Sequence, residues 1–420
     1  MESALSEHIW IWYALCGLIA LEALFWHCVL GFLRRAKPTL RADTYDGPPD
    51  SAPRISVVVA ARNEEQNIEA CVGSLLAQDY PNYEVIAVDD RSDDGTPVLL
   101  RRLLAGSEGK LQVVTIRELK AGWFGKNNAM REGVARSTGE WLCFTDADCR
   151  FTSRKALVAA LRDALTHRAD FLTLLPPLEE HATWERIIQP ACVIMMLSWF
   201  LPWRVNDPRS KIAYGNGQFM LMTRECYNAI GGHFRVRAEL NEDMVMSRNA
   251  KEGGFRLRMA ENTGLSKTRM YPSLTEAWSG WSRIFHGSIP SITQLGLAAV
   301  WHVVFAIGPW VCPAIALAGW WLTSDRTTLP WLSMLGASLA ALVVHQSVLW
   351  RVYGMMHSRR IWSLAHGLGS TVLVGMLLNA ITKSLGLTST TWRGVTYRSG
   401  KLETDAVPSD DGVVAADPEP

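Results

Sequence analysis

The sequence has almost no net charge and no excess of basic residues. Its 420 residues include 42 lysine and arginine residues and 41 aspartate and glutamate residues, a formal net charge of +1. Nothing in that balance attracts a polyanion. We therefore expect no nucleic acid partner. The length allows two or three domains.

Closely spaced cysteine pairs are also missing. The eight cysteines include no Cys-x-x-Cys motif, which argues against a zinc site and against a disulfide framework. Some lie in apolar runs, such as Cys16 and Cys312, and others in the polar part of the chain, such as Cys71 and Cys143. We expect reduced thiols in a protein that faces the cytoplasm.

One long run near the N-terminus has almost no charge. Residues 9–33 are long enough for one bilayer crossing, and Glu22 is their only formally charged residue. We expect Glu22 either to pair with a polar group of a neighbouring helix or to belong to a helix that lies partly in the membrane plane. No small-residue cleavage site is evident, which favours an uncleaved anchor over a signal peptide. Basic residues follow at 34–41, so the positive-inside tendency places this end of the anchor in the cytoplasm.

Three further apolar segments occupy the C-terminal part, at about 296–322, 330–350 and 362–382. Together with the anchor they predict four crossings, and the 18 tryptophans, most of them in or beside these runs, suit an interfacial aromatic belt. Four crossings would place the tail outside the cell, whereas the basic residues that flank the last segment favour the cytoplasm, so the side of the membrane on which the tail lies stays open. The three glycines of the last segment, Gly367, Gly369 and Gly375, suggest a re-entrant rather than a regular helix.

Between the apolar ends, strand and helix patterns alternate. Apolar strands are predicted at 55–60, 83–88, 111–116 and from Trp141. A helical pattern lies between each strand and the next. This alternation predicts an α/β, Rossmann-like, largely parallel sheet with both faces covered. Acids stand just beyond the second and fourth strands, at the edge where ligands of open α/β sheets bind.

Asp146 and Asp148 follow the fourth strand at positions i and i+2. Two carboxylates at a strand end attract a hard divalent cation such as Mg²⁺ or Mn²⁺, which prefers oxygen ligands and substrate phosphates. An isolated Asp-x-Asp is also common in solvated turns. Asp243 presents a similar choice, because an acid at the start of a helix is often only a cap.

An aromatic-rich segment at about 184–203 contains a central run of about a dozen apolar residues, too short to span a bilayer. Pro190 and Pro202 bound that run. A helix lying at the membrane surface and an ordinary buried helix both remain open for it. The segment 278–283, Trp-Ser-Gly-Trp-Ser-Arg, is either an interfacial aromatic cluster or part of a substrate site.

Five motifs in order carry a family resemblance: Ala-Arg-Asn-Glu-Glu, Val-Asp-Asp-x-Ser-x-Asp-Gly-Thr, Gly-Lys-Asn-Asn-Ala, Asp-Ala-Asp and Asn-Glu-Asp. The chain resembles family 2 glycosyltransferases with the GT-A fold over about residues 54–285. Its apolar ends resemble the membrane-bound branch, which includes ceramide-glucosyltransferase-like enzymes and bacterial enzymes that glycosylate hopanoids or carotenoids. The Gln-x-x-Arg-Trp pattern of processive relatives is not present.

The resemblance implies a site. Asp243 would be the general base, and Asp148 with Asp146 would hold the metal. Asp90 would bind uracil. The remaining implied residues are Ala60, Arg62 and Glu64 at the nucleoside, Lys126 near the phosphates, and Glu242, Trp281 and Arg283 as acceptor or diphosphate contacts.

The implied reaction is inverting, metal-dependent transfer of a sugar from a nucleotide-sugar, a UDP-sugar by the resemblance, to a membrane lipid hydroxyl. The alternatives are a polysaccharide synthase, a membrane nucleotidyltransferase and a non-enzymatic scaffold. Three C-terminal crossings are few for a polymer channel, which favours single transfer. The expected location is a bacterial-type inner membrane with the catalytic domain in the cytoplasm. The expected division is an anchor at 1–33, a linker at 34–53, the catalytic domain at 54–285, a membrane region at 286–388 and a tail at 389–420 that ends in disorder.

Overall fold

A computed structural model describes residues 2–36, 38–289, 291–322, 329–392, 395–398 and 401–402, with side chains described over 9–31, 38–289, 291–322 and 329–388. Its centre is an eight-stranded sheet of order β1-β9-β7-β8-β5-β2-β3-β4. Only β8 runs antiparallel to its neighbours. The strands are β1 (Thr39–Arg41), β2 (Ile55–Ala61), β3 (Tyr83–Asp90), β4 (Leu111–Ile116), β5 (Trp141–Asp146), β7 (Phe171–Leu175), β8 (Met220–Thr223) and β9 (Leu257–Thr263). The predicted α/β, largely parallel fold is confirmed.

Each strand of the sheet centre buries side chains on both faces. In β2, Val58 packs into one core while Val57 and Val59 pack into the other, because successive strand residues point to opposite faces. Continuous apolar runs are therefore what this sheet requires. The flanking helices are α2 (Ile68–Leu76), α3 (Thr96–Ala105), α4 (Gly125–Arg136) and α5 (Ala156–Thr166). A separate two-stranded ladder joins β6 (Cys149–Phe151) to β10 (Ser266–Thr268).

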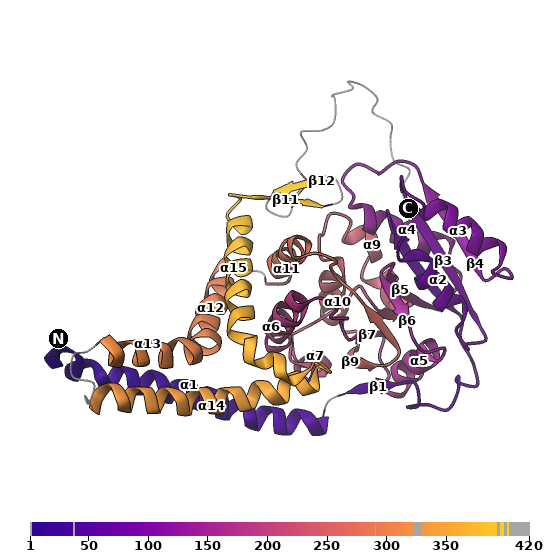
Figure 1. Cartoon of the computed structure of the whole chain (residues 1–420). Helices are drawn as coiled ribbons and strands as arrows, with labels where there is room; N and C mark the ends of the chain where they lie inside the picture. Colours follow the sequence, from indigo (N-terminus) through magenta and orange to yellow (C-terminus); the bar gives the residue numbers. More distant parts are fainter. Residues whose placement is uncertain are drawn as a thin grey trace.

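A second group of helices lies between the sheet and the apolar ends (Figure 1). These are α6 (Thr183–Trp199), α7 (Pro202–Asn206), α10 (Glu242–Glu252) and α11 (Leu274–Ser288). The short helices α8 (Arg224–Ala229) and α9 (Gly232–Arg235) pack elsewhere, α8 against β5 and β8 and α9 against α4. The expectation that Pro190 bounds the aromatic segment was wrong, since α6 continues through it. Packing of α6 against α15 stabilises a helix that has lost one backbone hydrogen bond at the proline.

The apolar ends form helices α1 (Glu2–Ala36), α12 (Ile292–His302), α13 (Gly308–Leu322), α14 (Leu329–Met355) and α15 (His366–Ser384). A π-helical turn (Val303–Ile307) joins α12 to α13, and a 3-10 turn (Arg360–Ala365) precedes α15. By length and composition, four of the described segments can cross a membrane: Ile9–Gly31, Ile292–Leu322, Leu329–Met355 and Arg360–Ser384. In Figure 1, α1, α13 and α14 run alongside one another, whereas α12 and α15 run across them, and α15 packs against α6 and α11.

The expectation that three glycines disrupt the last segment was also wrong, because α15 is a regular helix. Each glycine instead lies where a neighbour comes very close. A Cβ on Gly369 would stand 2.1 Å from the Ile187 carbonyl oxygen of α6. Gly367 faces Trp310 and Gly375 faces Trp278 in the same way. Beyond α15 the described strands β11 (Ser389–Trp392), β12 (Val395–Arg398) and β13 (Lys401–Leu402) pair antiparallel. The predicted disorder at the end of the tail falls on residues 403–420, outside the described residues.

Candidate active site

The carboxyl ends of β2, β3 and β5 meet at one edge of the sheet. Ala60 of β2 aligns with Val88 of β3 on one side and with Asp146 of β5 on the other. Because these strands are parallel, their terminal acids emerge together. The sequence prediction that Asp90 and Asp146 share an edge is therefore confirmed.

Two loops at this edge are tied together by hydrogen bonds. The Glu64 backbone N–H donates to Thr96 Oγ1 at 2.8 Å, and the Glu65 N–H donates to Asp94 Oδ2 at 3.1 Å. In the opposite direction, the Gly95 N–H donates a hydrogen bond to Glu65 Oε2 at 2.9 Å. These contacts fix the loop that carries Arg62 and Glu64, the residues expected beside a nucleoside. Whether they bind one stays a prediction.

Asp90 is buried at the end of β3 and is already paired. Arg91 donates to both of its carboxylate oxygens, from Nε to Oδ1 at 2.8 Å and from Nη2 to Oδ2 at 3.0 Å. A Cβ on Gly125, the first residue of α4, would stand 2.4 Å from Asp90 Oδ2. The glycine thus lets the start of α4 approach Asp90. A uracil base bound at Asp90 would have to share this carboxylate with Arg91.

Lys126 joins two acids from different elements. Its Nζ lies 2.7 Å from Asp146 Oδ1, at the end of β5, and 2.7 Å from Glu242 Oε1, at the start of α10. Burial alone would lower the pKa of Lys126, but the charges of Asp146, Glu242 and Asp243 outweigh it and raise that pKa. Lys126 is therefore a permanent cation that holds the sheet edge against α10.

Asp243 lies next to this ion pair. Its Oδ2 accepts a hydrogen bond from the Gly217 N–H at 2.8 Å, and its Oδ1 accepts one from the Met244 N–H at 2.7 Å. Burial and the charge of Glu242 raise the pKa of Asp243, while Lys126 opposes that rise. A carboxylate whose pKa is raised toward neutrality is better suited to accept a proton than an ordinary surface aspartate.

Asp148 lies two residues beyond Asp146, in the turn between β5 and β6. Burial and the charges of Asp146 and Glu64 raise its pKa. That excess of negative charge suits a divalent cation. No group of three or more His, Cys, Asp or Glu side chains with metal-binding geometry occurs among the described residues. Asp146 and Asp148 therefore fit a cation that takes its other ligands from substrate phosphates and water.

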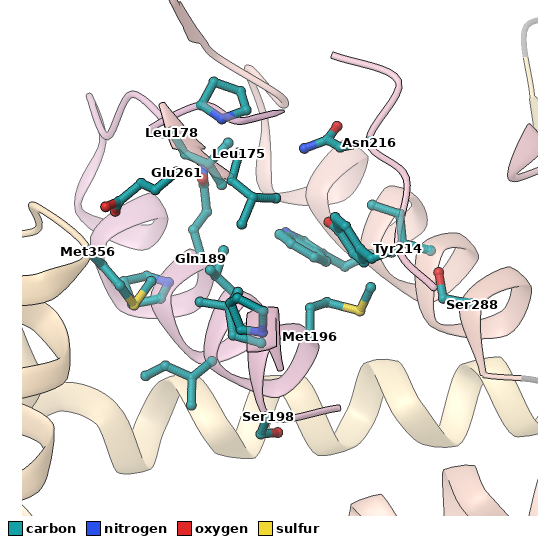
Figure 2. A pocket seen from close by; sticks show the side chains of 18 of the residues that line it. Leu175, Leu178, Gln189, Met196, Ser198, Tyr214, Asn216, Glu261, Ser288 and Met356 are labelled. Carbon is teal, nitrogen blue, oxygen red and sulfur yellow. The ribbon is translucent and has the colours of Figure 1, made fainter. Parts of the chain in front are cut away.

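A cavity of about 390 Å³ runs from these acids to the apolar helices. Lys126, Asp146, Glu242 and Asp243 line it at the sheet edge, and Glu22, Trp26 and Leu30 of α1 line it at the other end. Figure 2 shows part of its wall, where Leu175, Leu178, Met196 and Met356 surround Gln189. Residues of α14, including Val348, Leu349 and Val352, complete it.

Trp281 and Arg283 of α11 line the same cavity. Trp281 is buried and stacks on Phe285, and its Nε1 has no hydrogen-bond partner among the residues that the structure describes. The structure thus gathers six predicted site residues around one cavity. The other five do not line it and lie at or just beyond the carboxyl ends of β2, β3 and β5: Ala60, Arg62, Glu64, Asp90 and Asp148.

Sequence reasoning missed several residues of this site. Gly217 stands between Lys126, Asp146 and Asp243, and a Cβ on Gly215 would lie 2.2 Å from the Asp243 carbonyl oxygen. The Gly-Asn-Gly-Gln run at 215–218 was the available signal, since paired glycines often mark a close backbone approach. Gln189 gave no signal, because its importance depends on a cavity made by distant segments.

The family comparison supports the motif order. Residues 56–225 match the model of Glycosyl transferase family 2. The match covers less than half of the chain and shows that this part of it is similar to family 2 glycosyltransferases. The predicted resemblance is confirmed. Asp243, Trp281 and Arg283 lie beyond the matched residues, so their roles depend on the geometry described above.

The chain is also similar to proteins of known name. The beta-monoglucosyldiacylglycerol synthase of Synechocystis sp. is 33% identical over 151 residues, 34% of this chain and 30% of that protein. The 4,4'-diaponeurosporenoate glycosyltransferase of Staphylococcus aureus is 25% identical over 233 residues, 54% of this chain and 60% of that protein. The chain thus covers less than two thirds of the length of either relative.

Among solved structures, a mannosyltransferase from Pyrobaculum calidifontis in complex with GDP-Man and Mn²⁺ is similar to the chain with a TM-score of 0.44 and 18% sequence identity. The match covers 88% of this chain and 99% of that chain.

Proposed function

We propose that this protein transfers a sugar from a nucleotide-sugar to a hydroxyl group of a membrane lipid, with inversion at the anomeric carbon. A UDP-sugar is the donor that the family resemblance implies. The observation that carries the proposal is the cavity that reaches from Asp243 to α1 and α14. A soluble acceptor would need no passage lined by segments that are apolar enough to cross a bilayer.

The proposed mechanism begins at Asp243. Its carboxylate takes the proton of the acceptor hydroxyl as the hydroxyl oxygen attacks the anomeric carbon. The bond from that carbon to the diphosphate breaks on the opposite face, and the diphosphate leaves with the bonding electrons. Gly217 holds the Asp243 carboxylate in place through its N–H. Lys126 keeps Asp146 and Glu242 on either side of the cavity mouth.

Asp146 and Asp148 would hold a divalent cation, Mg²⁺ or Mn²⁺, on the donor side. When bound there, the cation would act as a Lewis acid and stabilise the charge that develops on the leaving diphosphate. The half-buried position of Asp148 beside the charges of Asp146 and Glu64 is the property of this chain that supports the assignment.

The test is a donor screen with purified protein and extracted membrane lipids, read by mass spectrometry. We expect a lipid that has gained one sugar and an equal amount of free nucleoside diphosphate. Release of pyrophosphate would indicate a nucleotidyltransferase, and a ladder of sugar additions would indicate a polysaccharide synthase. Membranes from cells without the protein serve as the control.

We also propose that the catalytic domain faces the cytoplasm of a bacterial-type inner membrane, where nucleotide-sugars are made. Native Cys71 and Cys143 cannot report on this, because both are buried. A cysteine introduced at exposed Val98 of α3 can. An impermeant maleimide should label Val98→Cys in lysed cells and not in sealed cells. Labelling in sealed cells would place the domain outside.

A further inference from the structure

The cavity wall has an excess of negative charge. Six carboxylates line it, and only two of the lining residues, Lys126 and Arg283, are permanent cations. The six are Glu22, Asp146, Glu180, Glu242, Asp243 and Glu261. Lys126 is already bound to two of these acids. An anionic headgroup would therefore meet more negative than positive charge in this cavity.

Besides Trp281, the buried side chains Gln189 and His345 on this wall have polar atoms without a hydrogen-bond partner among the described residues. Gln189 of α6 is 1% exposed, and neither its Nε2 nor its Oε1 has a hydrogen bond among the described residues. His345 of α14 is 7% exposed, and its Nε2 is likewise without a partner in the described part of the chain. Both line the cavity, and Figure 2 shows Gln189 within its wall.

Burying a polar group without a hydrogen bond lowers the stability of the folded protein. A buried amide that makes no hydrogen bond loses its solvation without compensation, so folding alone would favour leucine at position 189. A glutamine amide has no net charge, its NH2 group donates up to two hydrogen bonds, and its carbonyl oxygen accepts up to two. It is matched by a hydroxyl, ester or amide group, and not specifically by a phosphate or a carboxylate.

We propose that the cavity selects an uncharged lipid that carries a second hydrogen-bonding group besides the reacting hydroxyl, and that Gln189 binds this second group. The inference rests on the proposed transfer to a lipid and specifies its acceptor class. In this account Gln189 is a specificity-determining residue for the acceptor. His345 is placed to contact the same lipid farther along the passage, on the α14 side.

The first experiment separates a membrane lipid extract on an anion exchanger into an uncharged pool and an anionic pool. Each pool is offered with nucleotide-sugar to the purified full-length protein. We expect the sugar to appear on lipids of the uncharged pool, at least about tenfold more than on the anionic pool. Transfer mainly to anionic lipids would overturn the inference while supporting the proposed function. Transfer to neither pool would overturn both.

The second experiment uses Gln189→Leu with Gln294→Leu as the matched control. Gln294 lies on α12, its Oε1 also has no partner among the described residues, and it does not line the cavity. With the uncharged pool we expect Gln189→Leu to lower kcat/KM for the acceptor by about 10- to 100-fold, the usual effect of one unmade hydrogen bond to a buried group. Gln294→Leu should leave this value unchanged.

Two further readouts separate recognition from a structural role. Donor binding to Gln189→Leu, measured by calorimetry, should equal that of the wild type. Its Tm should be equal or higher, because the substitution removes an unpaired buried amide. A lower Tm together with weaker donor binding would make Gln189 structural and overturn its assignment. Wild-type kcat/KM for the acceptor in this variant would overturn it as well.

Discussion

The backbone N–H of Gly217 donates a hydrogen bond to Asp243 Oδ2 at 2.8 Å, which joins the loop before β8 to the start of α10. The absence of a side chain at Gly217 is part of this contact. A Cβ there would lie 2.8 Å from Lys126 Nζ and 3.5 Å from Asp243 Oδ2. The position of the proposed base thus depends on a residue 26 positions away in the sequence.

Gly217→Ala should reduce transfer more than stability. The nearest atom is the tip of a flexible lysine, so the fold can adjust, but Lys126 must then leave its position beside Asp146. Displacements of about 1 Å at an active site can cost on the order of 10²-fold in rate. We expect a fall in kcat of at least about tenfold with an unchanged Tm. Gly73→Ala, in open space on α2, is the control. A large loss of Tm with Gly217→Ala would contradict this reasoning.

Lys126→Ala should change the pH dependence of transfer. Lys126 opposes the rise in the pKa of Asp243, so its removal should raise that pKa further. Asp243 accepts a proton only when ionised, and the acidic limb of the kcat profile should therefore move to higher pH. Lys120→Ala removes the same charge from an exposed pair with Glu132 and should leave the limb in place. A limb that stays still or moves to lower pH in Lys126→Ala would show that Asp243 is not the titrating base.

Asp148→Ala should abolish most of the activity while the protein still folds and inserts. The substitution removes one of the two carboxylates proposed for the metal. Chelator should inactivate the wild type, and added Mn²⁺ or Mg²⁺ should restore it. Asp79→Ala, which removes an exposed acid paired with Arg154, is the control. Full wild-type activity in excess chelator would rule out the metal assignment.

Gly369→Ala should destabilise the contact between α6 and α15. Its Cβ would meet the Ile187 carbonyl oxygen at 2.1 Å, and backbone cannot move aside as a side-chain tip can. Overpacking of this kind costs about 1–3 kcal/mol. We expect a lower Tm in detergent. Gly336→Ala on α14, where a Cβ meets open space, should not lower it. Equal Tm values for the two variants would show that the helices separate easily.

The sheet could be predicted because each of its central strands buries both faces. Continuous apolar runs such as Ile55–Ala61 cannot belong to an amphipathic surface element, and their terminal acids then fall at one edge by parallel pairing. The short strand β1 was missed, because three residues in a proline-containing stretch become a strand only through pairing with β9. No local pattern contains that partner.

The same limit applies to the helices. Pro190 and the glycines of α15 predicted breaks from local propensity, and tertiary packing overrode both predictions. The cavity could not be predicted, because α1, α6, α11 and α14 each contribute part of its wall. Gln189 is an ordinary polar residue in the sequence and becomes notable only when its unpaired amide is seen in that wall.

The central claim is that Asp243 activates a lipid hydroxyl at the cavity mouth, and Asp243→Asn tests it most directly. The amide keeps the size of the side chain and an oxygen for the Gly217 N–H, but it cannot accept the proton. The decisive measurement compares nucleotide-sugar binding with sugar transfer to extracted lipid in this one variant. We predict donor binding equal to the wild type and transfer lower by roughly 10²–10⁴-fold. Retained transfer, or an equal loss of donor binding, would contradict the account.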